Sequence, residues 1–207
     1  MTKKLGISCM AVGAVLIVMA LSLFLYNRLE DRQAGEAADS VLPELQAAIE
    51  EAAKSLPQAQ MQHDSSVAVD PNASAQMPET EINGYAYIGY LSLPSIDLEL
   101  PVMSQWDDER LRIAPCRHTG SVDGDDLVIA GHNYDRHFGR LTNLKQGDLV
   151  FFTDLTGTTT AYSVVMTEVL DATAIHEMLN SSWALTLYTC TYGGQDRVAV
   201  RCERMEQ

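Results

Sequence analysis

The chain has 207 residues, of which 46% are hydrophobic, and its formal net charge is −14. This length is sufficient for one globular domain with additional segments. The acidic balance excludes the basic surface that a nucleic-acid-binding protein requires. We interpret the acidity as a solvated, soluble surface.

The N-terminal segment is apolar from Leu5 to Tyr26 and contains no charged residue. About 20 such residues span the hydrocarbon core of a membrane. Lys3 and Lys4 precede the segment, which favours a cytoplasmic N-terminus and an exterior location for the rest of the chain. A cleavable signal peptide is the alternative, but Leu23–Arg28 lacks the small residues of a cleavage site. We therefore predict a cytoplasmic tip and an uncleaved, single-pass signal anchor over residues 1–29.

Residues 30–80 are predicted to form an extracellular stalk. Ser40 is a candidate N-cap, and apolar residues recur after it at helical spacing, which predicts a helix from about Leu42 to Ser55. The apolar stripe of this helix either docks on the following domain or is a narrow face on a spacer. Residues 58–80 are rich in Gln, Ser, Ala, Asp and Pro, which is typical of a flexible linker.

Residues 81–207 change to short β-rich runs separated by turn residues, which predicts one β-dominated domain. The expected strands are Tyr85–Leu93, Leu98–Val102, Leu127–Ala130, Leu149–Thr153, Thr159–Leu170, Leu185–Thr189 and Arg197–Cys202. Short helices are expected over Asp107–Ile113 and Ala174–Asn180. Many short strands with few helices favour a closed barrel or a sandwich, and closure of a barrel hides the strand edges.

Cys190 is the candidate nucleophile, because it ends the expected strand Leu185–Thr189. A glycine turn follows, and Arg197 opens the next strand. A thiol beside a guanidinium is suited to attack a carbonyl carbon and to stabilise the resulting oxyanion. Arg201 competes with Arg197 for this role, but it lies further along the same strand and therefore further from the edge.

A thiol enzyme also needs a protonatable group for the leaving amine, and histidine is the usual choice. His132 follows the strand Leu127–Ala130 and a glycine. His137, in the same loop, is expected to be a dispensable surface histidine.

The remaining cysteines and acidic residues leave other interpretations open. Cys116 and Cys202 either form a disulfide or are buried as free thiols. We predict no cofactor, although two groups contain side chains that bind metals. One group could in principle bind zinc but has irregular spacing for it, and it consists of Cys116, His118, His132 and His137. The other group is an acidic turn that calcium would fit, and it consists of Asp123, Asp125 and Asp126.

The segment Thr186-Leu-Tyr-Thr-Cys190 resembles the Thr-Leu-x-Thr-Cys signature of the sortase family. Arg197 opens a Val-Ala-Val strand, as the arginine of that family does. Gly131-His132-Asn133, followed by Phe138-Gly-Arg-Leu141, resembles the segment around the family's histidine. The similarity covers residues 84–203, which is almost all of the expected exterior domain.

The resemblance implies an all-β dominated fold, an eight-stranded sortase-type β-barrel with short helices, after an N-terminal transmembrane helix. It implies a cysteine transpeptidase, classified with the thiol proteases, on the cell membrane of Gram-positive bacteria. Its partners would be secreted proteins with a C-terminal sorting signal and an amine of a peptidoglycan precursor or a pilin. Cys190 would form the thioacyl-enzyme, His132 would protonate the leaving amine, Arg197 would stabilise the oxyanion, and Thr189 would bind substrate.

Two questions stay open at this point. The segment between Leu170 and Trp183 is short, which argues against the long helical insertion associated with class B sortases but leaves a compact class B-like enzyme open. A housekeeping-like or class D-like sortase fits the compact barrel. The same three residues would also serve a membrane-anchored thiol hydrolase that uses water as acceptor. A non-catalytic, surface-binding barrel is the third interpretation.

Overall fold

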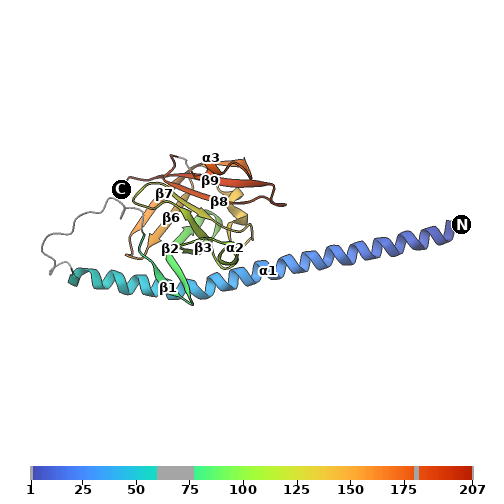
Figure 1. The fold of residues 1–207 in the computed structure, drawn as a ribbon, viewed down its shortest axis with the longest axis horizontal. Helices are drawn as coiled ribbons and strands as arrows, with labels where there is room; N and C mark the ends of the chain where they lie inside the picture. Colours follow the sequence, from blue (N-terminus) through green and yellow to red (C-terminus); the bar gives the residue numbers. More distant parts are fainter. Residues whose placement is uncertain (1, 60–76, 180–181, 207) are drawn as a thin grey trace. The chain divides into compact units, whose positions relative to one another are not determined.

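The computed structural model describes residues 2–59, 77–179 and 182–206 (Figure 1). The predicted linker over residues 58–80 lies largely outside these ranges. The helices are α1 (Thr2–Ala59), α2 (Asp108–Leu111) and α3 (Ile175–Leu179), with 3-10 turns η2 (Pro94–Ile96) and η3 (Phe138–Asn143). The strands are β1 (Thr80–Ile82), β2 (Tyr85–Leu93), β3 (Leu98–Met103), β4 (Cys116–Thr119), β5 (Leu127–Ala130), β6 (Leu149–Asp154), β7 (Thr159–Asp171), β8 (Leu185–Cys190) and β9 (Asp196–Arg204).

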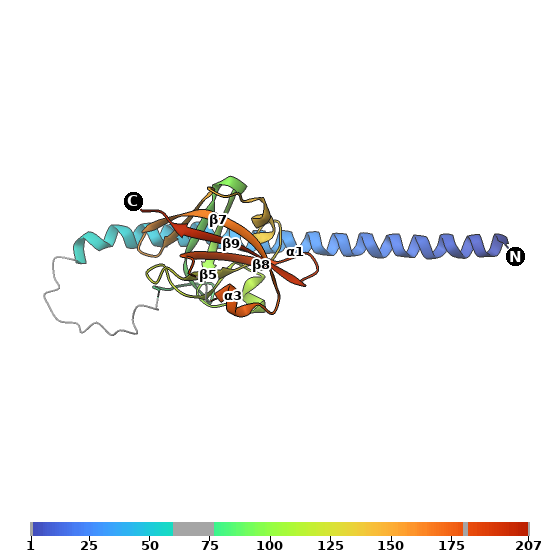
Figure 2. The same ribbon diagram turned by 90° about the horizontal axis from the view of Figure 1, so that it is seen from above.

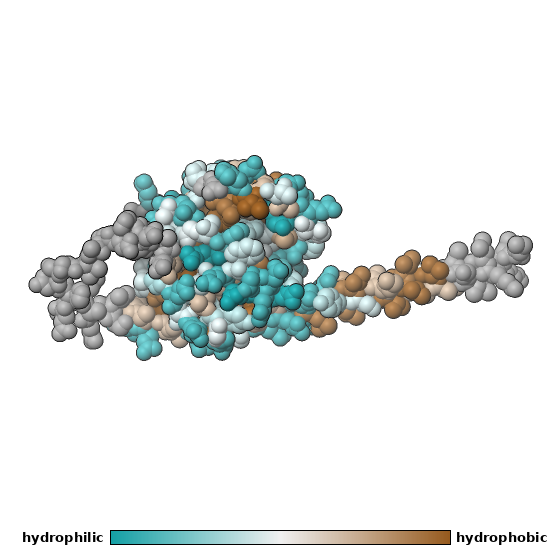
Figure 3. All heavy atoms as spheres, viewed as in Figure 1, coloured by the Kyte–Doolittle hydropathy of each residue, from teal (hydrophilic) through white to brown (hydrophobic). Residues whose placement is uncertain are grey.

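The chain divides into two compact units, an anchor unit of residues 1–33 and a barrel unit of residues 34–207. The N-terminal part of α1 is long and apolar enough to cross a membrane, by length and composition. Its large apolar side chains are exposed, among them Leu16 and Phe24 at 60% and 56% (brown spheres in Figure 3). Such exposure is costly in water and favourable in lipid, so the anchor unit has the surface of a membrane span.

The barrel unit contains a closed mixed sheet, in which eight strands follow the order β2-β3-β4-β5-β8-β9-β7-β6 and β6 pairs with β2. The closing pairs run antiparallel from Gly89 and Asp154 to Ser92 and Phe151. Two neighbouring pairs, β3–β4 and β5–β8, are parallel. β1 adds to the outer edge of β2. The eight-stranded barrel predicted from the sequence is confirmed.

The barrel interior is filled by one face of each strand. On β8, Leu185 and Leu187 are completely buried and lie opposite Cys202 and Val200 of β9. Side chains alternate between the two faces of a strand. Thr186, Tyr188 and Cys190 therefore belong to the outer face of the barrel.

A second apolar cluster lies outside the barrel, where α1 packs on the sheet (Figures 1 and 2). Val41, Leu45 and Ile49 recur at i, i+4 and i+8, and at most 5% of each side chain is exposed. They cluster with residues that include Tyr87 and Met103. The apolar stripe predicted for the stalk helix thus docks on the barrel.

The helix is longer than the sequence pattern predicted, because no helix start occurs at Ser40. Its hydroxyl donates a hydrogen bond to the Ala37 carbonyl at 2.8 Å, inside α1, instead of capping a terminus. Residues before Ser40 include many strong helix formers, Ala, Glu, Arg, Gln and Leu. The helix therefore runs without a break into the segment that was predicted to start at Leu42.

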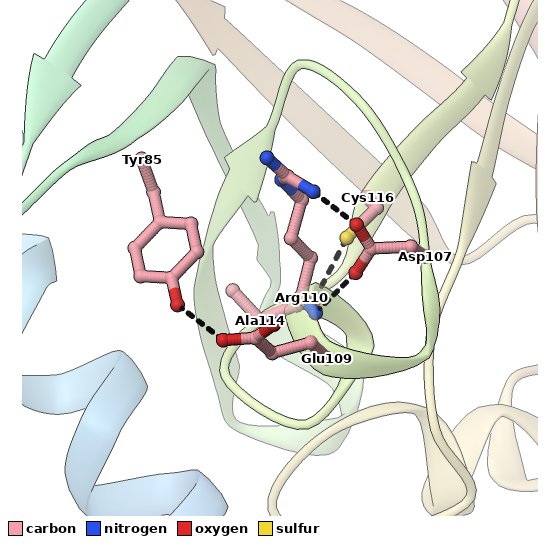
Figure 4. Close-up of polar contacts among 6 residues, drawn as sticks. All are labelled: Tyr85, Asp107, Glu109, Arg110, Ala114 and Cys116. Atoms are coloured by element: carbon pink, nitrogen blue, oxygen red, sulfur yellow. Dashed lines mark hydrogen bonds and ion pairs between the residues drawn. The ribbon is translucent and has the colours of Figure 1, made fainter.

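The connection between β3 and β4 is held by short-range polar contacts (Figure 4). Asp107 caps α2 by accepting a hydrogen bond from the Arg110 backbone N–H at 2.8 Å. The Tyr85 hydroxyl donates to Glu109 at 3.0 Å. The predicted helix Asp107–Ile113 is thus shorter than expected, with its first residue serving as the cap. The strand β4 that follows was not predicted.

Candidate active site

The ends of β5 and β8 bring His132 and Cys190 to one edge of the barrel. The two strands are parallel neighbours, and Ala130 pairs with Tyr188 (Figure 2). The Gly131 N–H continues the ladder by donating to the Tyr188 carbonyl at 3.0 Å. His132 and Cys190 each lie two residues beyond this pair, so both stand at the same edge of the sheet. Beyond them, the Asn133 side-chain amide donates to the Thr191 carbonyl at 3.4 Å.

Arg197 joins this row from the other side, because it is the antiparallel partner of Cys190 on β9. Paired residues on neighbouring strands share a face of the sheet. Arg197 donates from Nη1 to the carbonyls of Gly194 and Asp196, at 3.0 and 3.1 Å. The guanidinium is thereby held at the β8–β9 turn, beside the strand end that carries the thiol.

Cys190 differs from the other two cysteines of the barrel unit in its accessibility. Cys190 is half-buried, whereas Cys116 and Cys202 are free thiols with no exposed surface. Burial raises the pKa of Cys116 and of Cys202 to about 12. The alternative of a Cys116–Cys202 disulfide is therefore not realised, and Cys190 is the thiol that a substrate can reach.

The backbone around His132 is held by close packing. A Cβ atom added to Gly131 would lie 2.5 Å from Cδ2 of Phe138, so only glycine permits this approach. Phe138 is completely buried, and its N–H donates to the His132 carbonyl at 3.0 Å. The ring of His132 lies 4.7 Å from that of Tyr134. The loop therefore has a defined conformation at the histidine.

Thr189 and Arg201 do not belong to the row that His132, Cys190 and Arg197 form at the edge of the barrel. Thr189 pairs with Val198, is 3% exposed, and its hydroxyl has no hydrogen-bond partner among the described residues. It belongs to the inner face of the barrel, and its role in substrate binding stays a prediction. Arg201 is 1% exposed and binds Glu168 at 2.7 Å and Thr186 at 2.9 Å. It also donates to the carbonyls of Glu177 and Met178.

These bonds explain why Arg201 is a poor competitor for the substrate role. Its guanidinium ties β7, β8 and α3 together from a buried position, so its donors are used by the fold. Arg197, in contrast, lies at the open edge. The sequence favours Arg197 over Arg201 by its place at the start of the strand and by the family resemblance, and the burial of Arg201 supports this preference.

An aromatic and histidine cluster beside Cys190 was not identified from the sequence. Tyr188, on the same face of β8 as Cys190, contacts His118 of β4 through Oη and Nδ1, 2.5 Å apart. Trp106 lies against His118, with ring centroids 4.7 Å apart, and is 45% exposed. Burial raises the pKa of Tyr188 to about 12, and the neighbouring Arg197 opposes this shift. No periodic pattern marks these residues, because they come from three separate segments.

A closed mixed barrel of eight strands is typical of the sortase fold. The Sortase domain model matches residues 91–205. The chain therefore belongs to the sortase family of transpeptidases. No curated protein matches the chain.

Solved structures of sortases share this fold. A sortase C from Streptococcus pneumoniae is 21% identical, with a TM-score of 0.56, and the match covers 81% of this chain and 97% of that chain. A sortase D5 transpeptidase from Clostridium perfringens is 18% identical, with a TM-score of 0.58, and the match covers 83% and 99%. Sortase C from Clostridium perfringens, solved with the C-terminal cell wall sorting motif, is 23% identical, with a TM-score of 0.53 and coverage of 82% and 91%.

Proposed function

We propose that this protein is a membrane-anchored cysteine transpeptidase in which Cys190, His132 and Arg197 act together. The observation that supports the proposal is their placement in one row, at the ends of β5 and β8 and at the start of β9. The anchor unit would cross the cell membrane once, with Lys3 and Lys4 on the cytoplasmic side. The barrel unit would then lie outside the cell, where secreted proteins emerge.

In the proposed reaction, the Cys190 thiolate attacks the scissile carbonyl carbon of a C-terminal sorting signal. The negative charge that develops on the carbonyl oxygen is stabilised by the Arg197 guanidinium. The carbon–nitrogen bond then breaks, and His132 gives its proton to the leaving amine. A thioester between Cys190 and the N-terminal part of the substrate remains.

The second half of the reaction transfers the acyl group to an amine. We propose an amine of a peptidoglycan precursor or of a pilin lysine as acceptor. It attacks the thioester carbon, loses a proton to His132, and releases Cys190 as a thiolate. The proposal includes no cofactor, because thiol, imidazole and guanidinium supply the nucleophile, the acid and the charge.

The test is incubation of the full chain, solubilised in detergent, with a panel of sorting-signal peptides. Mass measurement should detect an acyl-enzyme on Cys190, and addition of triglycine should convert it to a peptide–triglycine product. Release of the free acid alone, even with triglycine, would indicate a thiol hydrolase. No acyl-enzyme with any peptide, and no selective labelling of Cys190 by a thiol probe, would indicate a non-catalytic barrel.

A further inference from the structure

We propose that residues 34–39 of α1, the first part of the helix in the barrel unit, position the loop that carries His132. This inference rests on the proposed function, since it assumes that His132 is the proton donor. Residues 131–137 form this loop, here called the histidine loop, between β5 and η3. The helix contacts it at Arg136 and at His137.

The first contact places the Arg136 side chain across the helix at Gly35. A Cβ atom added to Gly35 would overlap with Nε and Cδ of Arg136, and would lie 2.6 Å from its Cζ. The guanidinium ends on Asp39, one helical turn later, with which it forms an ion pair. Residues at i and i+4 lie on one face of a helix. Gly35 therefore provides the space, and Asp39 the charge, that hold Arg136.

The second contact is made by His137, whose side chain is completely buried. Its Nε2 lies 3.3 Å from the carbonyl oxygen of Ala34, which is itself only 4% exposed. The sequence predicts a surface histidine here, and the structure corrects this location, because docking of α1 covers the residue. That loss of His137 costs little activity stays a prediction.

The histidine loop transmits these contacts to His132 through its own packing. The His137 ring lies 5.7 Å from the Tyr134 ring, and the Tyr134 ring lies 4.7 Å from the His132 ring. The N–H groups of His137 and Gly139 both donate to the Tyr134 carbonyl, at 3.0 and 2.8 Å. Movement of the loop backbone at Arg136 or His137 would therefore displace the residues that support the His132 ring.

For Arg136, such a displacement would affect catalysis more than folding. A general acid must lie within hydrogen-bond reach of the proton acceptor, and a misplacement of about 1 Å can lower the rate about 100-fold. The Arg136–Asp39 pair is largely exposed, at 42% and 59% of the two side chains. Pairs of this kind contribute little to stability. Arg136 is accordingly a positioning residue, and its loss should leave the fold intact.

The experiment uses the full chain in detergent and compares Gly35→Leu with Gly13→Leu. Both replacements lie in α1, but nothing approaches within 4 Å of a Cβ at Gly13. We expect Gly35→Leu to lower kcat about 10- to 100-fold with little change in KM, and Gly13→Leu to behave as wild type. The thermal midpoint of Gly13→Leu should not fall, because leucine favours a helix more than glycine does. At Gly35 the same gain should offset part of the strain that the larger side chain introduces.

A charge exchange provides the second arm. Arg136→Glu and Asp39→Arg should each lower kcat, and the double variant should recover most of it, because the pair is restored with reversed charges. The inference is overturned if kcat is unchanged in Gly35→Leu and in both single variants. It is also overturned if kcat falls only in variants whose thermal midpoint falls as well, and the double variant recovers neither kcat nor the thermal midpoint. Absence of acyl-enzyme in the wild type would instead refute the proposed function.

Discussion

His118 Nδ1 and Tyr188 Oη lie 2.5 Å apart, and this contact joins β4 to the strand that ends at Cys190. Burial lowers the pKa of His118 and raises the pKa of Tyr188 to about 12. Both side chains are therefore neutral near pH 7. They share one hydrogen bond beside the candidate site, whose chemistry depends on charge.

We expect this neutral state of His118 to make the protein less stable in acid. Its pKa is lower in the folded than in the unfolded state, so the unfolded state binds more protons and stability rises with pH through about pH 6.5. His118→Asn should remove this dependence. The measurement is the thermal midpoint of both proteins at about pH 5.5 and 7.5. The difference in thermal midpoint between variant and wild type should favour the variant more at the lower pH than at the higher pH. An equal difference at both pH values would contradict the prediction.

Selective alkylation should distinguish the three thiols of the barrel unit. Iodoacetamide reacts with thiolates, and burial keeps Cys116 and Cys202 protonated with pKa values of about 12. We expect modification of Cys190 alone in the native protein, and of all three after denaturation, as measured by peptide mass mapping. Cys190→Ala should abolish both the native modification and the acyl-enzyme. Native labelling of Cys116 would show that the fold around β4 is wrong.

Arg197→Met and Arg201→Met form a matched pair on one face of β9. The first should lower kcat/KM by about 100-fold or more, through loss of transition-state stabilisation, with an unchanged thermal midpoint. The second removes the donors to Glu168 and to buried acceptors, and should cost about 3 kcal/mol of the unfolding free energy. That corresponds to a fall of roughly 10 °C in the midpoint. Equal stability losses in the two variants would argue against this division of roles.

His132→Ala should lower activity, whereas His137→Ala should lower stability. His132→Ala should remove the proton donor and lower kcat by about 100- to 10,000-fold, with the fold intact. His137→Ala leaves a cavity under α1 and should lower the unfolding free energy by about 1–3 kcal/mol. Circular dichroism melts and acyl-enzyme kinetics on both variants separate the effects. A fully stable His137→Ala protein would contradict the burial of this ring.

The sequence was sufficient to predict β2, β3 and β5 to β9, since each combines β-branched or aromatic residues with flanking turns. It missed the three-residue strand β1 and the strand β4. It was not sufficient for β4, because Arg117 and His118 interrupt the apolar pattern and a proline precedes the strand. Only pairing with β5, and a single pair with β3, makes this segment a strand.

The candidate site shows the same division. Cys190, Arg197 and His132 are recognisable because each stands at the end or start of a strand and matches a family motif. Tyr188 lies within that motif at a variable position, and Arg136 and Gly35 are distant in sequence. Tyr188 meets His118 only when β4 and β8 come together in the barrel, and Arg136 meets Gly35 only after α1 docks. Local patterns carry no information about such contacts.

The parallel pairing of β5 with β8 has a consequence for how the chain acquires activity. The two strands are separated in sequence by the entire β6–β7 hairpin, so this contact is among the non-local ones that slow folding. Under the proposed function, a chain that emerges unfolded from the membrane would have its thiol and its imidazole far apart. Acylation would then wait until the barrel closes, which would protect a newly exported protein from premature reaction with its neighbours.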